Sequence, residues 1–116
     1  MKSIYEYIDS ILSETGLPFY HGMPEFDEQN PEPEKYLVYD EYETPVYLGD
    51  GIYPRKRYFF TVNIFTPYAD ENLFKGLESR LIRGGFVYTG GGKVGEEKTF
   101  PYKEQYYKEF QILWEV

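Results

Sequence analysis

Over residues 57–66 the side chains fall on two faces with a period of two and are mostly β-branched or aromatic, which predicts a β-strand. Both faces of this strand carry β-branched or aromatic side chains, so we expect packing on both sides, more thoroughly on one. Pro67 ends the strand, because proline lacks the amide that a strand ladder needs. One face holds Tyr58, Phe60, Val62 and Ile64, and the other holds Phe59, Thr61, Asn63 and Phe65.

A helix is predicted directly after this strand, because the apolar positions then change to a period of 3.6. Asp70 can cap its first turn, and Gly84–Gly85 ends it, since glycine is free to adopt a positive φ. The apolar positions of this helix are Leu73, Phe74, Leu77, Leu81 and Ile82.

A first helix is predicted over residues 4–14. Ser3 and Glu6 form the S-x-x-E capping box that opens it, and Gly16 and Pro18 end it. Its apolar residues share one face and are expected to be buried: Ile4, Ile8, Ile11 and Leu12.

The other segments complete a single domain over residues 1–116. Residues 17–22 are short and aromatic, in keeping with a brief edge strand, and residues 24–34, with three prolines and five acids, predict an exposed loop. Strands are predicted over residues 35–43, 86–89 and 105–116, with residues 90–95 as a flexible glycine loop. Hairpin connections dominate, so we expect an α+β fold: a mainly antiparallel sheet of four to five strands with two helices on one face. The last strand should turn three side chains to the core: Phe110, Ile112 and Trp114.

Residues 44–56 are predicted to form a projecting hairpin arm, because Asp50-Gly51 is a typical hairpin dipeptide. Such an arm is normally polar, yet this one is apolar and needs covering, either by the core of its own domain or by another subunit. We favour the second, which predicts a subunit interface through Val46, Tyr47, Leu48, Ile52 and Tyr53.

The amino-acid composition limits the classes of function that are compatible with the chain. The 14 tyrosines and 9 phenylalanines suit either a protein–protein contact surface or simply an aromatic-rich sheet. The net charge of −8 opposes stable binding to nucleic acid, although an acidic wall could let nucleic acid slide past. There is no cysteine, which excludes disulfides, thiolate metal sites and thiol catalysis. No stretch reaches the roughly 20 apolar residues of a membrane span, and the acid-containing N-terminus is not a signal peptide, so we expect a soluble, unexported protein.

Candidate chemistry is sparse. The run Gly90–Lys93 lacks the spacing of a phosphate loop. His21 is the only histidine and is interpreted as structural or superficial. Asp40 and Glu41 should point to opposite faces of a strand, so they cannot act together as a carboxylate pair or in a cation site. We therefore predict no catalytic residue, no metal site and no cofactor, and expect that the acids at 40–43 pair across the hairpin with Arg55, Lys56 and Arg57.

The order of segments resembles a family of small tailed-phage proteins, the tail completion or tail terminator proteins of the head–tail junction. The matching features are an N-terminal helix (SIYEYIDSIL), an aromatic segment with proline (LPFYHGMPE), the strand YLVYDEY, the unit YFFTVNIFTPYADENLFKGLESRLIRGGF and the closing strand KEFQILWEV. The strand resembles the family's P-Y-I-V-Y-x-E, although Lys35 stands where proline is common.

This resemblance implies a ring, commonly a hexamer, that caps the tail tube and presents a docking surface to the head connector. Its partners would be further copies of itself, the major tail tube protein and the connector, with DNA only passing through the lumen. It would act in the bacterial host cytoplasm during assembly and then at the tail end of the virion, or of a prophage particle. The alternative is a binding module for a small molecule or a protein, without catalysis, whose pocket is lined by Tyr36, Tyr58, Phe60 and Tyr106.

Overall fold

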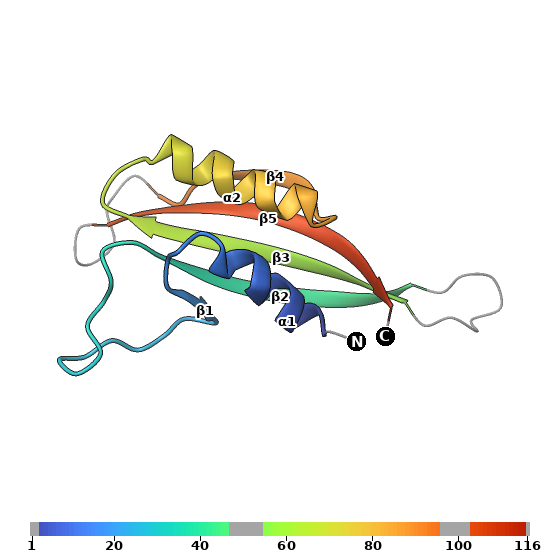
Figure 1. The fold of residues 1–116 in the computed structure, drawn as a ribbon, viewed down its shortest axis with the longest axis horizontal. Coiled ribbons are helices and arrows are strands. Elements are labelled where there is room, and N and C mark those ends of the chain that lie inside the picture. The colour runs from blue at the N-terminus through green and yellow to red at the C-terminus, as the bar shows by residue number, and fades with distance from the viewer. Residues whose placement is uncertain (1–2, 47–54, 96–102, 116) are drawn as a thin grey trace.

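The computed structural model describes residues 3–46, 55–95 and 103–115 (Figure 1). In chain order the elements are α1 (Ile4–Ser13), β1 (Phe19–His21), β2 (Tyr36–Val46), β3 (Arg55–Thr66), α2 (Glu71–Arg83), β4 (Val87–Lys93) and β5 (Glu104–Glu115). The strands form one five-stranded sheet in the order β1-β2-β3-β5-β4. Neighbouring strands are antiparallel except β1 and β2, which are parallel. The predicted α+β fold with a mainly antiparallel sheet is confirmed.

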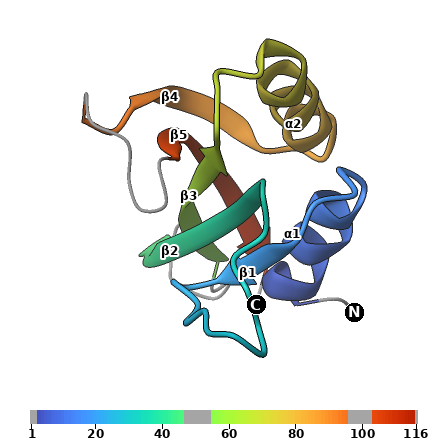
Figure 2. The same ribbon diagram turned by 90° about the vertical axis from the view of Figure 1, so that its left-hand side faces the viewer.

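Both helices lie on the same side of the sheet, as Figure 2 shows. In α1 the Ser3 hydroxyl accepts a hydrogen bond from the Glu6 amide at 3.1 Å, as the capping box predicts. The helix buries the apolar stripe expected of it, so its amphipathic pattern alone determines which face meets the sheet. The buried members are Ile4, Ile8, Ile11 and Leu12.

Helix α2 also begins as predicted, because the Asp70 carboxylate accepts a hydrogen bond from the Leu73 amide at 3.1 Å. Its buried residues are Phe74, Leu77 and Leu81. Ile82, which was expected in the same stripe, is 49% exposed, so that prediction is wrong. Each helical residue is rotated about 100° from the one before it, and Leu81 already points at the sheet, so Ile82 points to water.

Strand β4 corrects the predicted glycine loop, because residues 90–93 continue the strand along β5. A register shift between Tyr88 and Gly90 marks a β-bulge. A Cβ on Gly91 would lie 2.5 Å from the Tyr107 carbonyl oxygen and 2.8 Å from the Tyr88 hydroxyl. Glycine here permits a close approach of backbones, which propensity rules do not anticipate.

The predicted loop at 24–34 covers part of the sheet face that lies opposite the helices. Phe26 packs edge-on against Tyr36, with ring centroids 5.2 Å apart, and Tyr20 packs against the same ring. Tyr36 and Phe65 are stacked at 4.8 Å and buried, so this face has a small core of its own at one end. In the described parts of the chain, no helix is long and apolar enough to cross a membrane.

Candidate functional site

The sheet face opposite the helices is open at the end away from Tyr36. Beyond Tyr39, strand β2 becomes exposed. Tyr42 is 62% exposed and stacks on Phe59 of β3, with ring centroids 4.6 Å apart and planes at 10°. The two residues lie directly opposite each other on neighbouring strands, and their stacked rings form a cross-strand aromatic pair.

The same open face continues across β5 to β4. Leu113 is 45% exposed and Val87 is 56% exposed, and Arg57 lies directly across the ladder from Leu113. With Gln111 they border a shallow hollow of about 310 Å³ at the edge of the sheet. We call this exposed set, from Tyr42 and Phe59 to Leu113 and Val87, the open apolar face. Apolar side chains therefore alternate with Gln111 and Arg57 on this exposed part of the sheet.

The predicted interface residues of the arm are only partly in view. Val46 is the last residue of β2 and lies across the ladder from Arg55. Tyr47, Leu48, Ile52 and Tyr53 fall outside the described residues. The ladder from Tyr36 to Val46 shows that β2 runs further toward the arm than residues 35–43, the predicted span.

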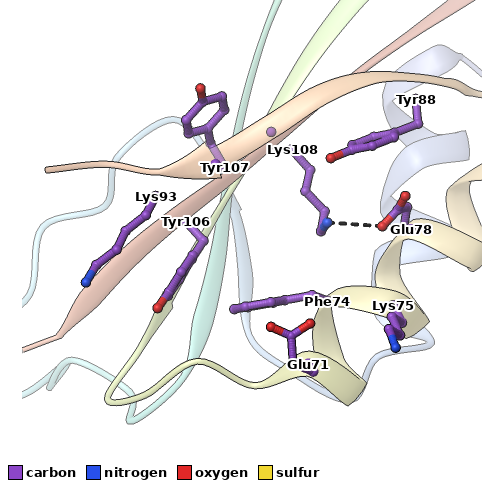
Figure 3. A pocket seen from close by; sticks show the side chains of 11 residues that line it. Glu71, Phe74, Lys75, Glu78, Tyr88, Lys93, Tyr106, Tyr107 and Lys108 are labelled. Carbon is purple, nitrogen blue, oxygen red and sulfur yellow. Dashed lines mark hydrogen bonds and ion pairs between the residues drawn. The ribbon is translucent and has the colours of Figure 1, made fainter. Parts of the chain in front are cut away.

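A second hollow, of about 380 Å³, lies between α2 and strands β4 and β5 (Figure 3). Lys108 points into it and pairs with Glu78 of α2 at 3.1 Å. The Lys108 ammonium also lies over two rings, 5.9 Å from the Phe74 centroid and 5.1 Å from the Tyr88 centroid. The lysine is therefore neutralised and enclosed, and its role is to tie the helix to the sheet.

At the other end of this hollow, Tyr106 donates a hydrogen bond to Glu104 at 2.6 Å. That bond, together with burial, raises the pKa of Tyr106 to about 12. Lys93 pairs with another oxygen of Glu104 at 3.3 Å. Glu104 and Lys93 are therefore partners within the chain, and the raised pKa keeps Tyr106 protonated near neutral pH.

His21 pairs with Glu41 on the adjacent strand, not with the nearby acids of the 24–34 loop. Its ring stacks on Tyr39, with centroids 4.7 Å apart, and on Tyr5 at 5.3 Å. Sequence reasoning missed this partner, because the parallel pairing of β1 with β2 that brings them together has no sequence signal.

The acids of β2 divide between the two faces, as predicted. Asp40 is exposed, and Glu41 faces the helices beside His21. Glu43 pairs with Lys56 of β3 at 2.8 Å, which confirms that member of the predicted cross-hairpin pairing. The hydrogen bond from Lys56 lowers the pKa of Glu43. These contacts are structural, and no group of three or more metal-ligating side chains gathers anywhere in the described residues.

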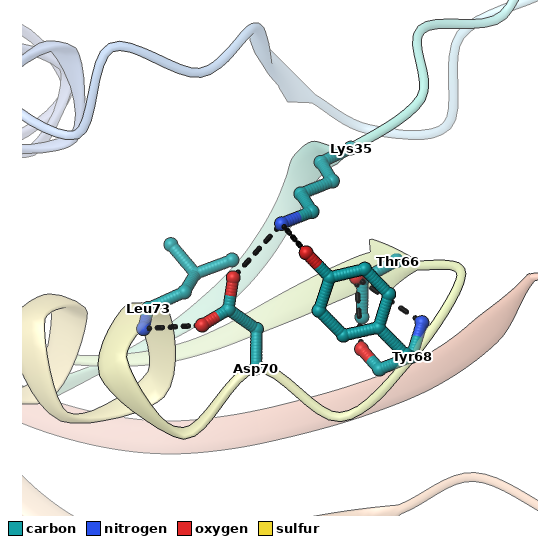
Figure 4. A network of polar contacts seen from close by, with 5 residues as sticks. All are labelled: Lys35, Thr66, Tyr68, Asp70 and Leu73. Carbon is teal, nitrogen blue, oxygen red and sulfur yellow. Dashed lines mark hydrogen bonds and ion pairs between the residues drawn. The ribbon is translucent and has the colours of Figure 1, made fainter.

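A polar network at the opposite end of the sheet fixes the start of α2 (Figure 4). The Lys35 ammonium donates to Asp70 at 2.9 Å and to the Tyr68 hydroxyl at 2.8 Å. The bond from Lys35, with that from the Leu73 amide, lowers the pKa of Asp70. The carboxylate thus caps the helix and joins it to the chain just before β2.

The four residues of the predicted ligand pocket do not line one cavity. Tyr58 and Phe60 are buried in the core beneath the helices. Tyr36 belongs to the small core on the opposite face, and Tyr106 alone of the four borders the hollow beside α2. One site lined by all four is therefore excluded, because Tyr36 lies on the opposite face of the sheet from the other three.

Comparison with known proteins identifies the fold. No protein-family model matches the chain, and no curated protein matches it. A solved chain described as "Virion of native gene transfer agent (GTA) particle" superposes with a TM-score of 0.58 at 11% sequence identity. The alignment covers 98% of this chain and 92% of that chain. The two chains share their fold over almost their whole lengths.

Proposed function

We propose that this protein is a structural component of a tailed-phage or phage-derived particle, which forms a ring on the end of the tail tube and joins the tail to the head connector. The observation that carries the proposal is the shared fold with a chain of a virion, which extends over 98% of this chain and 92% of the other. The tail-end position and the ring follow from the resemblance of the segments to tail terminator proteins.

The surface of the molecule supports an assembly role. The open apolar face exposes Tyr42, Val87 and Leu113 to water, and a neighbouring subunit that covered them would gain the free energy of removing apolar surface from water. The charge of −8 suits a lumen through which DNA passes without binding, because acidic side chains repel phosphates. Within the described residues His21 pairs with Glu41 and Lys108 pairs with Glu78, and both contacts stabilise the fold. The proposal therefore includes no catalytic step.

Two measurements test this function. Native mass spectrometry and negative-stain electron microscopy at rising protein concentration should show a closed ring, with six copies expected. Added to purified tail tubes from the same particle, the protein should bind one end and stop elongation. A chain that stays monomeric and leaves tube length unchanged contradicts the proposal.

A genetic experiment gives an independent result. Deleting the gene from the phage or prophage that encodes it should leave heads and tails unjoined, with tails of irregular length. Restoring the gene should restore complete particles, and Leu113→Glu should fail to do so while the purified variant remains folded. Normal particles after deletion would overturn the assignment.

A further inference from the structure

The sheet has two open edges, one at each side. Strand β1 pairs with β2 only as far as Tyr39, and β2 continues for seven residues, 40–46. On the other side, β4 is seven residues long and pairs only with β5. Within the described residues no other strand lies against either edge (Figures 1 and 2). Open edges offer unpaired amides and carbonyls to another chain.

The hydrogen bonds on the β1 side of β2 show which residues of β2 direct their backbone amides and carbonyls away from β3. Leu37 donates its amide to that side, and Tyr39 accepts there through its carbonyl. Successive residues in a strand direct their backbone groups to alternate sides. The outward groups beyond β1 therefore belong to Glu41, Glu43 and Pro45, and the last offers only a carbonyl.

The same reasoning applies to β4. Val94, just beyond the strand, donates its amide to the Gln105 carbonyl at 2.8 Å. By alternation Gly92 points to β5, and Lys93 and Gly91 direct their backbone groups to the open side. Two residues on each edge are thus ready to exchange hydrogen bonds at the same two-residue spacing.

We propose that β4 of one copy pairs with residues 40–46 of β2 in the next copy, antiparallel, with Lys93 opposite Glu41 and Gly91 opposite Glu43. This pairing rests on the ring of the proposed function and specifies how it is joined. Strands β2, β3, β5 and β4 alternate in direction, so copies that share one orientation bring β4 against an antiparallel β2. A head-to-tail contact of this kind closes into a ring when the rotation from one copy to the next divides a full turn evenly.

The side chains agree with this register on both faces. On the helix face Lys93, which pairs with Glu104 in its own chain, comes beside Glu41, which pairs with His21, so each gains a second neighbour of favourable polarity. On the open face the exposed ring of Tyr42 comes over Gly92, which has no side chain to displace. The Tyr107 ring lies beside Gly92 on this face, so in this register Tyr42 meets an aromatic ring next to the glycine backbone.

The irregular points of the two strands also coincide. In this register Pro45, which has no amide to donate, lies opposite Thr89, inside the β-bulge of β4 where the ladder is already interrupted. Moving the register by two residues, with Glu41 opposite Gly91, instead brings Glu43 against the bulge and separates Glu41 from Lys93. Of these two registers, only the first places Lys93 beside Glu41, Tyr42 over Gly92 and Pro45 against the bulge.

Disulfide trapping tests the pairing directly, because the natural chain has no cysteine. Tyr42 and Gly92 would form a non-hydrogen-bonded pair with Cα atoms about 4.5 Å apart, which a disulfide can bridge. A Cβ on Gly92 meets its nearest atom, in the Tyr107 ring, at 3.4 Å, so the cysteine is accommodated. Purified Tyr42→Cys and Gly92→Cys chains are mixed at ring-forming concentration and oxidised, and the Tyr42→Cys/Gly92→Cys double variant is oxidised alone.

The mixture should give a covalent dimer, and the double variant a ladder that ends at the number of copies in the ring. Bridging should be at least about tenfold faster than for Gly92→Cys with Tyr68→Cys, a tyrosine 53% exposed but away from both edges. Rings that form without this cross-link overturn the pairing and leave the proposed function standing. Gly92→Cys chains that bridge to each other overturn it in favour of a two-fold β4 contact. If the unmodified chain forms no oligomer at all, the pairing and the ring both fail.

Discussion

Gly84 is the point at which the two helices meet, and adding one methyl group there should destabilise the fold. Its φ of −77° and ψ of 0° are accessible to alanine, so the substitution causes no backbone strain. A Cβ would lie 2.6 Å from Cδ1 of Ile11, 3.2 Å from the Tyr7 hydroxyl and 3.3 Å from the Leu81 carbonyl oxygen. The Tyr7 hydroxyl also donates a hydrogen bond to the Gly84 carbonyl at 2.6 Å. Helix α1 therefore cannot move away from Gly84 without lengthening that hydrogen bond.

The magnitude follows from two opposing terms. Overpacking a fitted contact costs about 1 to 3 kcal/mol, and replacing glycine by alanine gains about 0.4 to 1 kcal/mol through the less flexible unfolded chain. Gly84→Ala should therefore lower the free energy of unfolding by about 1 to 2 kcal/mol. Gly76→Ala is the matched control, because a Cβ there meets only the flexible end of Arg80, at 2.9 Å. In the interior of α2 it should raise the free energy of unfolding by about 0.5 to 1 kcal/mol.

Urea unfolding followed by far-UV circular dichroism measures both effects on the same scale. The two variants should move the midpoint in opposite directions, each by roughly 0.3 to 1 M for a domain of this size. The measurement is made at low protein concentration, so that assembly does not add to stability. A Gly84→Ala variant as stable as the natural chain would show that the helices are not in the close contact described, and the reasoning would be wrong.

Substitutions at three further residues test local features of the fold by urea unfolding. Gly85 has φ of +96° with its nearest neighbouring atom 3.9 Å away, so Gly85→Ala should cost about 1 kcal/mol through backbone strain alone, and Gly85→Asn less. Asp70→Ala removes the cap on Leu73 and should cost about 1 kcal/mol at neutral pH. Because the folded pKa of Asp70 is lowered, its contribution is present above the ordinary carboxyl pKa and is lost as pH falls through the lowered value, so the variant should lose less stability on acidification. The pKa of Tyr106 is raised to about 12, so its contribution to the free energy of unfolding is complete below about pH 10 and is lost as pH rises toward 12. Tyr106→Phe should therefore lose less stability than the natural chain over this alkaline range. Equal losses in the two chains would show that the hydrogen bond to Glu104 is absent.

Local sequence signals were sufficient for the elements that are amphipathic and capped. The Ser3 cap and the apolar stripe of α1 are where the pattern predicts them, and so are the Asp70 cap and most of the buried face of α2. The alternation in residues 57–66 likewise predicts β3, with Tyr58 and Phe60 turned to the main core. In each of these cases the side chains carry both the period and the direction of burial.

Sequence patterns were insufficient for glycine segments and for residues whose packing partners are distant in the sequence. Gly90 to Gly92 have no pattern to reveal a strand, and β5 alone supplies the ladder that makes them one. Phe26 looks exposed among prolines and acids, yet it packs on Tyr36 because the loop folds back over the sheet. The assembly surface predicted on the arm lies mostly outside the described residues and stays a prediction. Within the described residues the sheet exposes further apolar side chains, such as Tyr42, and the alternation along β2 does not show what covers them.

The two open edges also carry features that normally prevent strands from pairing. A proline, a lysine and a bulge each discourage edge-to-edge association, and here they occur as Pro45, Lys93 and the irregularity at Thr89. In the proposed register these features face one another, the proline against the bulge and the lysine against Glu41. A contact of β2 with β2 centred on Tyr42 would instead bring Glu41 opposite Glu43, and like charges directly opposite are unfavourable. The same devices that protect an edge from indiscriminate pairing therefore permit one head-to-tail contact, which is the condition for a ring that closes and does not aggregate.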